Sequence, residues 1–393
     1  MLRFINTNNS KYFALLIIII TFLFRIPFLS IESDDYSDSL YPWVVFIQEH
    51  GYVNALKYNF ANYTPPYLYF LVLVAKVGHP LIMIKFLSII FDYFMAFFVA
   101  KIINLKYKNE IYFWLSFALV PLIPTVFCNS SWWGQCDSIY SSFVMGSIYF
   151  LMRKQNLYSV LFLSIAFCFK LQTIFIFPLF FILLLRGNIK WYYFLLIPIA
   201  YFIAVLPAWI VGRPLQDLLL IYLEQTNQYS ALQNNFDNFY RPLEYAVGTS
   251  LINLYIDIIR RIGIIITFLC VFLLCLFLSK KKYKFTNDLL IDIEFLFLVL
   301  IPFLLPGMHE RYLYLADVSS LMIFLYTKRP YQLVIIFVSS WGYMNFLLSL
   351  NSKCNDYMYC LLCFIAYIFV LFLSIYWLYK RLSLQSSNTV SIK

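Results

Sequence analysis

The chain has 393 residues, of which 63% are hydrophobic and only 12% charged, and its mean hydropathy is +0.78. Soluble domains carry about 25% charged residues, so this composition excludes an ordinary soluble globular protein and requires lipid as part of the solvent. The formal net charge is +10, but the basic residues are spread between apolar runs and form no motif for nucleic acid. The sequence therefore predicts an integral membrane protein that does not bind nucleic acid.

Apolar runs along the chain predict about twelve transmembrane helices. They are expected over residues 12–30, 81–103, 110–128, 137–152, 157–169, 173–186, 190–211, 263–279, 288–305, 313–327, 330–350 and 358–379. The apolar stretch 66–78 is shorter, because about 13 residues reach only ~20 Å across a hydrocarbon core of ~30 Å, and we expect it to lie at the interface. The predicted fold class is an all-α polytopic membrane protein. It is expected to form a single membrane-embedded domain over 1–393, with a core at about 12–330 and C-terminal helices over 330–379.

Basic residues predict the orientation in the membrane. Short alternate loops hold clusters such as Lys101, Lys106 and Lys108, whereas most carboxylates fall in the opposite loops. Because Lys and Arg are retained on the cytoplasmic side, the N-terminus is expected inside. The polar loops then share the outer face, where we expect an active site; they are 31–65, 129–137, the break at Lys170, 212–262 and 306–312.

The first outer loop contains four carboxylates within seven residues, at Glu32, Asp34, Asp35 and Asp38. An Asp at the membrane surface can act as a general base toward an acceptor hydroxyl. The alternative is a solvated acidic cap whose role is topological. Repulsion between the adjacent Asp34 and Asp35 would raise the pKa of one of them, and the sequence leaves open which one.

The loop 129–137, with the sequence NSSWWGQCD, places two Trp beside an amide and a carboxylate. Trp faces stack on the apolar faces of sugars, while Gln135 and Asp137 can bind hydroxyl groups. This combination predicts a carbohydrate-binding surface that includes Trp133. Interfacial anchoring of the Trp side chains is the alternative.

Two further polar breaks interrupt apolar stretches. His309, Glu310 and Arg311 are three consecutive ionisable residues, which are costly near lipid and therefore indicate function. The Arg fork matches phosphate oxygens, although an ion-paired helix cap is the alternative. Lys170 is expected to contact phosphate or to be structural, with both readings open. Within the second predicted span, Lys85 and Asp92 are expected to form a structural pair.

Taken in order, these motifs resemble the membrane-embedded GT-C glycosyltransferases, and most closely a bacterial group similar to the eukaryotic GPI mannosyltransferases. The resemblance extends from about residue 20 to 330. It rests on residues 33–36 with 42–43, 63–67 (YTPPY), 129–137, 169–172 and 308–312. It implies a GT-C type bundle of about twelve transmembrane helices with interfacial helices in the first outer loop.

The resemblance also implies an activity. The chain would be an inverting glycosyltransferase that moves one sugar, most often mannose, from a polyprenyl-phosphate donor to a glycan, lipid or protein acceptor. The reaction would take place on the extracytoplasmic side of a bacterial inner membrane. The family's base is an acidic residue of the first outer loop and matches Asp35, but Asp34 stands where the family has Gly, which leaves the choice between them open.

Roles follow for the other residues of these motifs. We expect the donor phosphate to meet His309, Arg311, Lys170 and Arg241. The sugar or the acceptor is expected to meet Trp133, Gln135, Asp137, Tyr63, Gln172 and Glu310.

The sequence assigns no cofactor, and it leaves a divalent cation open. The three His residues have no ligand spacing, but Asp34, Asp35 and Glu310 could share a divalent cation with phosphates. A lipid-linked sugar flippase or transporter is one alternative function, although transporters usually place ionisable residues at midplane and show repeated halves. A glycan polymerase or ligase is another, although such enzymes commonly have a larger outer loop.

Overall fold

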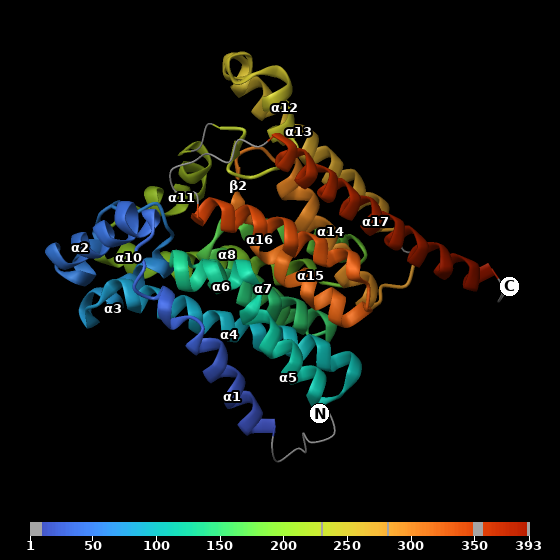
Figure 1. Cartoon of the computed structure of the whole chain (residues 1–393), viewed down its shortest axis with the longest axis horizontal. Coiled ribbons are helices and arrows are strands. Elements are labelled where there is room, and N and C mark those ends of the chain that lie inside the picture. The colour runs from blue at the N-terminus through green and yellow to red at the C-terminus, as the bar shows by residue number, and fades with distance from the viewer. Residues whose placement is uncertain (1–9, 229–230, 281–282, 349–356, 391–393) are drawn as a thin grey trace. The chain divides into compact units, whose positions relative to one another are not determined.

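The computed structural model describes residues 10–228, 231–280, 283–348 and 357–390 (Figure 1). Nearly all of them are helical, and the described residues hold a single sheet of two short parallel strands, β1 (Gln233–Asn234) and β2 (Met308–His309). The chain forms two compact units. The first unit contains Met1–Thr173 and Tyr192–Gln228, and the second contains Ile174–Trp191 and Tyr229–Lys393.

The first unit is built around its longest helix and the helices that pack against it. Its helices are α1 (Ser10–Leu23), α2 (Tyr41–Glu49), α3 (Pro65–Val77), α4 (Pro80–Tyr107), α5 (Glu110–Leu119), α6 (Pro124–Phe127), α7 (Asp137–Met152), α8 (Asn156–Phe169), α10 (Leu196–Val211) and α11 (Leu215–Gln228). Helix α7 packs against both α4 and α8, and α4 also packs against α5. The side of α7 toward these helices is lined by small residues, including Gly146 and Ser147, which allow the backbones to approach closely.

The second unit is organised around one enclosed helix. Its helices are α9 (Phe177–Leu185), α12 (Tyr240–Val247), α13 (Thr249–Leu278), α14 (Asn287–Leu304), α15 (Tyr314–Thr327), α16 (Leu333–Leu348) and α17 (Tyr357–Val390). Every residue of α14 from Leu289 to Phe303 is buried. Helix α14 packs against α15 and α17, and its two buried carboxylates bind partners on its neighbours, Asp292 with Arg329 and Arg381 and Glu294 with Ser319.

The helices confirm the prediction of an all-α membrane protein. Four are long and apolar enough to cross a membrane, and they cover Pro80–Tyr107, Trp191–Val211, Ser250–Leu278 and Tyr357–Gln385. A fifth span is possible if the bent pair Glu110–Leu122 and Pro124–Trp133 crosses as one. Each predicted apolar run contains a helix, although residues 349–350 of the run 330–350 lie outside the described residues. The full count of twelve spans and the single domain stay predictions.

Two segments differ from a simple alternation of spans and loops. The stretch 66–78 forms the 13-residue helix α3, which has the short length predicted for it. The loop predicted over 212–262 is instead largely helical, since it holds α11, α12 and the first turns of α13. These helices are amphipathic or polar at their starts, so they do not appear as apolar runs in the sequence.

A sharp bend positions the segment that carries the tandem Trp residues. The bent pair Glu110–Leu122 and Pro124–Trp133 departs from a straight helix by 58° at its break. Pro121 and Pro124 lie at the break, and each removes a backbone N–H that a continuous helix would need. The chain therefore turns back, and residues 128–133 pack against α4 within the first unit.

The close contact at Gly146 makes a prediction about stability. A Cβ placed there would lie 2.4 Å from Cδ1 of Phe162 and 3.1 Å from Cε2 of Phe98. We expect Gly146→Val to lower the free energy of unfolding by about 1–3 kcal/mol through overpacking. Thermal unfolding in detergent measures the effect. Adding Phe162→Ala makes room for the new side chain, so the double variant should lose less than the sum of the two single losses; additive losses would contradict the packing.

Candidate functional site

The first unit brings Asp35 into direct contact with the loop 129–137. The indole Nε1 of Trp133 donates a hydrogen bond to Asp35 Oδ2 at 2.8 Å, and Gln135 Nε2 donates to the same oxygen. Asp35 is half-buried, whereas Asp34 is exposed. Two N–H donors that converge on one carboxylate oxygen fix the orientation of the group and stabilise its negative charge. The structure thus joins three of the residues that the sequence predicted for the site.

Ser33 connects the first outer loop to the loop 129–137, which is called the Trp loop below. Its hydroxyl donates to the backbone carbonyl of Trp133 at 2.6 Å and accepts a hydrogen bond from the backbone N–H of Tyr36 at 3.2 Å. The Ser33 side chain is buried. One hydroxyl therefore caps the helical turn that carries Asp35 and fixes the distance of this turn from Trp133.

Gly134 and Lys85 support Trp133 and Gln135, the two donors to Asp35. Gly134 has a φ of +78°, a left-handed conformation that Gly adopts without strain, and it separates Trp133 from Gln135. A Cβ on Gly134 would contact the Lys85 stem at 3.6 Å. The ammonium of Lys85 donates to the backbone carbonyls of Phe28, at 2.8 Å, and Ile31, at 2.5 Å. Lys85 therefore supports both loops of the site from α4.

Tyr63 extends the cluster toward two other side chains. Its hydroxyl donates to Gln135 Oε1 at 3.3 Å. Its ring packs against Trp43 with a centroid distance of 5.6 Å. The Lys170 ammonium lies 5.9 Å from the Tyr63 ring centroid, within the range of a cation–π contact. The predicted residues Tyr63 and Lys170 therefore belong to the same cluster as Asp35.

Lys170 forms a buried ion pair with Asp137, and Asn129 Nδ2 donates to the other oxygen of Asp137 at 2.8 Å. Lys170 is 8% exposed and Asp137 only 1%. Asp137 thus binds Lys170 in this structure, and its predicted contact with sugar stays a prediction. Gln172 is half-buried in the short turn that follows Lys170.

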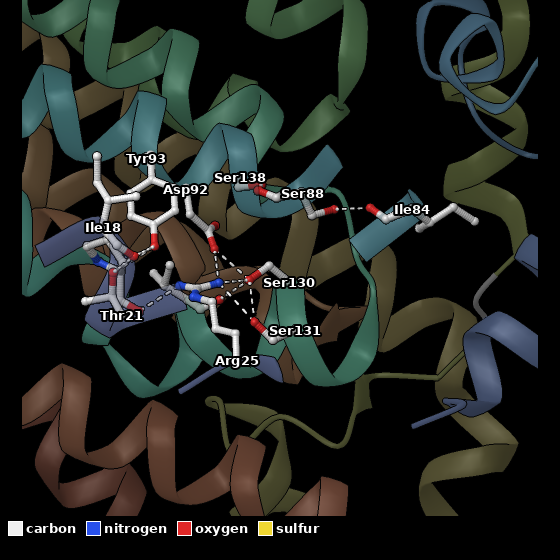
Figure 2. Close-up of polar contacts among 12 residues, drawn as sticks. Ile18, Thr21, Arg25, Ile84, Ser88, Asp92, Tyr93, Ser130, Ser131 and Ser138 are labelled. Carbon is white, nitrogen blue, oxygen red and sulfur yellow. Dashed lines mark hydrogen bonds and ion pairs between the residues drawn. The ribbon is translucent and has the colours of Figure 1, made fainter. Parts of the chain in front are cut away.

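A second polar network joins Arg25 and Asp92 to Ser130 and Ser131 of the loop 129–137 (Figure 2). Arg25 and Asp92 are both 0% exposed, and Arg25 Nη1 lies 2.6 Å from Asp92 Oδ2. The same nitrogen donates to the hydroxyls of Ser130, at 2.6 Å, and Ser131, at 3.0 Å, while Nη2 donates to the carbonyl of Pro121 at 2.7 Å. Ser130 also donates to Asp92. The network therefore holds the turn that immediately precedes Trp133.

The sequence analysis missed Arg25 and assigned Asp92 the wrong partner. Lys85 and Asp92 are seven residues apart in α4, which is about 10.5 Å along the helix axis and too far for a direct pair. Asp92 instead binds Arg25, and Lys85 binds backbone carbonyls. The available signal was a single Arg near the end of an otherwise apolar run, which is costly in lipid and calls for a carboxylate partner.

The second unit contains the remaining predicted residues. The strands β1 and β2 pair in the register Gln233 with Met308 and Asn234 with His309, and Gly307 N–H donates to the carbonyl of Leu232 at 2.8 Å. This pairing connects the segment that follows α11 with the motif at 308–312. Sequence patterns could not predict this pairing, because two-residue strands have no periodicity.

His309 lies beside Glu310, with 3.8 Å between Nδ1 and Oε2, and its ring is 5.1 Å from that of Tyr312. Arg311 follows in the turn Glu310–Leu313. Glu310 is buried, and Arg311 is half-buried. The histidine and the acid therefore form a compact ionisable pair in this unit.

Arg241, at the start of α12, pairs with Asp237 at 3.9 Å and lies 5.5 Å from the ring of Tyr245. Burial raises the pKa of Asp237, and the charge of Arg241 opposes this change. Of the predicted phosphate-binding residues, Lys170 thus belongs to the first unit, whereas Arg241, His309 and Arg311 belong to the second.

Within the described ranges, no group of three or more His, Cys, Asp or Glu side chains is arranged to hold a metal ion. Asp34 and Asp35 belong to the first unit and Glu310 to the second. A divalent cation that these carboxylates share with bound phosphates stays a prediction.

The chain matches no family model and no curated protein. Its function is therefore inferred from the side chains that each unit brings together.

The Arg25–Asp92 pair makes a prediction about stability. Arg25→Met leaves the Asp92 carboxylate buried without its charge partner, so we expect a loss of about 3–5 kcal/mol in the free energy of unfolding. Thermal unfolding in detergent measures it. The double variant Arg25→Met with Asp92→Leu removes both charges and should lose less. Arg153→Met, at the exposed Arg that follows the last residue of α7, is the control and should change stability by less than about 0.5 kcal/mol. A double variant as unstable as Arg25→Met would contradict this account.

Proposed function

We propose that the protein is a membrane glycosyltransferase that moves one sugar from a polyprenyl-phosphate donor to a hydroxyl acceptor. Mannose is the sugar that we propose. The observation that supports this proposal is the cluster around Asp35. Trp133 and Gln135 donate hydrogen bonds to this carboxylate. Gln135 also accepts a hydrogen bond from Tyr63, and the ring of Tyr63 contacts the Lys170 ammonium. A base, hydrogen-bond donors, aromatic faces and a cation are the groups that sugar transfer requires.

The proposed mechanism is a single inverting displacement. Asp35 takes the proton from the acceptor hydroxyl while the acceptor oxygen attacks the anomeric carbon of the donor sugar. The bond between that carbon and the phosphate oxygen breaks, and the electron pair leaves with the polyprenyl phosphate. Lys170 is proposed to stabilise the departing phosphate.

Asp35 is the better candidate for the base. Its carboxylate receives two N–H donors and is half-buried, so it has a fixed orientation toward a bound substrate. Asp34 is exposed to solvent, where a carboxylate samples several rotamers and binds water. Catalysis by a base depends on its geometry before its pKa, which favours the oriented group.

The proposed setting is a GT-C type bundle of about twelve spans in a bacterial inner membrane, with the site facing the periplasm or the exterior. The short helices α2 and α3 of the first outer loop would lie at the interface. The isoprenoid tail of the donor would lie between spans, and its phosphate would reach the cations at the outer surface. The acceptor would be a glycan, a lipid or a protein.

A lipid-linked sugar flippase is the main alternative, and a glycan polymerase or ligase is a further one. The buried pair of Asp92, inside the span α4, with Arg25, just after α1, resembles the intramembrane charges of transporters. However, both side chains are fully buried and bind the turn 128–133, so they serve the structure of the site and do not line a path. This arrangement favours a glycosyltransferase over a flippase.

The mechanism predicts that Asp35→Asn loses sugar transfer by about 10²–10⁴-fold, because the amide cannot take a proton. The matched variant Asp34→Asn, one residue away and exposed, should remain close to wild type. The measurement is the release of polyprenyl phosphate from polyprenyl phosphate mannose by purified protein, with glucose and arabinose donors in parallel.

The opposite pattern, with Asp34→Asn inactive and Asp35→Asn active, would move the base by one residue. If wild-type protein in liposomes carried the donor across the bilayer without cleaving it, the flippase would replace the transferase.

Arg311 provides a separate prediction for the donor phosphate. Arg311→Ala removes a charged partner, and we expect the donor KM to rise by an amount equivalent to about 2–4 kcal/mol. Arg311→Lys keeps the charge but loses the two-pronged geometry, so it should recover part of the affinity. Steady-state kinetics against donor concentration separates KM from kcat, and an unchanged donor KM in Arg311→Ala would argue against contact with phosphate.

A further inference from the structure

The first unit contains a cavity of about 350 Å³ between the first outer loop and α11. Its chemically distinctive lining residues are Trp43, Asn59, Phe60, Asn62, Glu224 and Gln225. Its volume is within the range of small-molecule pockets. Of these residues, Trp43 contacts the Asp35 cluster through Tyr63, and α11 lies in a segment that was expected to be a loop.

The wall formed by α11 is firmly held. Leu218 and Ile221 are 0% and 3% exposed, so one face of the helix is buried. Tyr201 donates from its hydroxyl to the backbone carbonyl of Leu218 at 3.0 Å, and Gln225 Nε2 donates to the backbone carbonyl of Asn62. These contacts fix the distance between the two sides of the cavity, which is therefore formed before any ligand binds.

A buried arginine supports the other wall. Arg213 is 1% exposed, and its Nη2 donates to the side-chain oxygen of Asn59, which lines the cavity. Its Nε and Nη1 have no hydrogen-bond partner among the described residues. Burial lowers the pKa of Arg213, and the carboxylates of Asp217 and Glu224 offset part of this change. Arg213 does not itself line the cavity, so its role is to orient the Asn59 amide at the wall.

The lining indicates the kind of ligand. Trp43 and Phe60 offer aromatic faces, which suit an apolar ring surface. Glu224 accepts hydrogen bonds, while the amides of Asn59 and Gln225 can both donate and accept them. The carboxylate disfavours an anion, and the polar groups disfavour a hydrocarbon. A neutral ring that carries several hydroxyl groups satisfies all of these side chains.

The cavity is connected to the Asp35 cluster by direct contacts. Trp43, on the cavity wall, packs against Tyr63 at 5.6 Å between ring centroids. The Tyr63 hydroxyl donates to Gln135, and Gln135 donates to Asp35. Two side chains, Tyr63 and Gln135, therefore separate the cavity wall from the carboxylate.

We propose that this cavity is the acceptor subsite and that it binds a neutral sugar unit, with Trp43 stacked on the ring and Glu224 accepting its hydroxyl protons. The transfer role rests on the proposed function, but the binding of sugar does not. Binding in the cavity would present a further hydroxyl of the acceptor toward Asp35.

The test measures sugar binding and sugar transfer separately. Purified full-length protein in detergent is titrated with the methyl α-glycosides of mannose, glucose and galactose and with mannose 6-phosphate, without any donor, and binding is followed by saturation-transfer NMR. We expect at least one neutral glycoside to bind more tightly than mannose 6-phosphate. Trp43→Ala and Glu224→Gln should each weaken it at least tenfold, and in the transfer assay they should raise the acceptor KM while leaving the donor KM unchanged.

One control variant and one conservative variant accompany this test. Glu49→Gln removes a carboxylate from the first outer loop, outside this cavity, and should leave binding unchanged. Glu224 is exposed, so Glu224→Gln is expected to fold even if Trp43→Ala does not.

The outcomes separate the subsite from the function. Binding that depends on Trp43 and Glu224, without any cleavage of donor, would support a sugar site and overturn the transferase. Normal donor cleavage, with no glycoside binding or with an acceptor KM that Glu224→Gln leaves unchanged, would overturn the subsite. Tighter binding of mannose 6-phosphate than of neutral glycosides would also overturn it.

Discussion

Arg25 and Asp92 carry opposite charges at positions that solvent does not reach, and this constraint determines much of the first unit. Removing an ion from water costs several kcal/mol, so each charge needs partners that replace its hydration. The structure supplies them from one place, because Ser130, Ser131 and the carbonyl of Pro121 all belong to the bent segment between α5 and α7. Satisfying the ion pair therefore fixes that segment. Trp133 and Gln135 follow it directly in the chain, and their positions are set by the same contacts.

Two further buried cations extend this principle to the site itself. Lys85 donates to carbonyls just before the first outer loop, and its stem lies under Gly134, so it fixes both sides of the contact with Asp35. Lys170 is held by Asp137 and lies next to Tyr63. A site built on buried charges has little freedom to relax, and its donors are in place before a substrate arrives. Such preorganisation is the main source of electrostatic catalysis in enzymes.

The sequence predicted the helices better than it predicted their contacts. Apolar runs located α4, α10 and α17 because lipid imposes a long and continuous hydrophobic pattern. The sequence also singled out Asp35, Trp133 and Gln135, which the structure brings into contact, since carboxylates, amides and Trp are conspicuous in an apolar chain. It failed where a contact depends on three-dimensional register, as in the pairing of Arg25 with Asp92. It also missed the cavity beside α11, because an amphipathic helix that covers a loop has the composition of a polar linker.

The adjacent carboxylates of the first outer loop illustrate how contacts can separate two groups that the sequence treats alike. Asp34 is exposed, so water and salt screen its charge and weaken its effect on its neighbour. Asp35 turns inward on the helical turn that Ser33 caps, and it meets donors from a segment about 100 residues away. Repulsion between the two is therefore a smaller influence than the hydrogen bonds that only one of them receives. A chain with Asp at both positions can still present a single oriented carboxylate, because folding has placed the other in solvent.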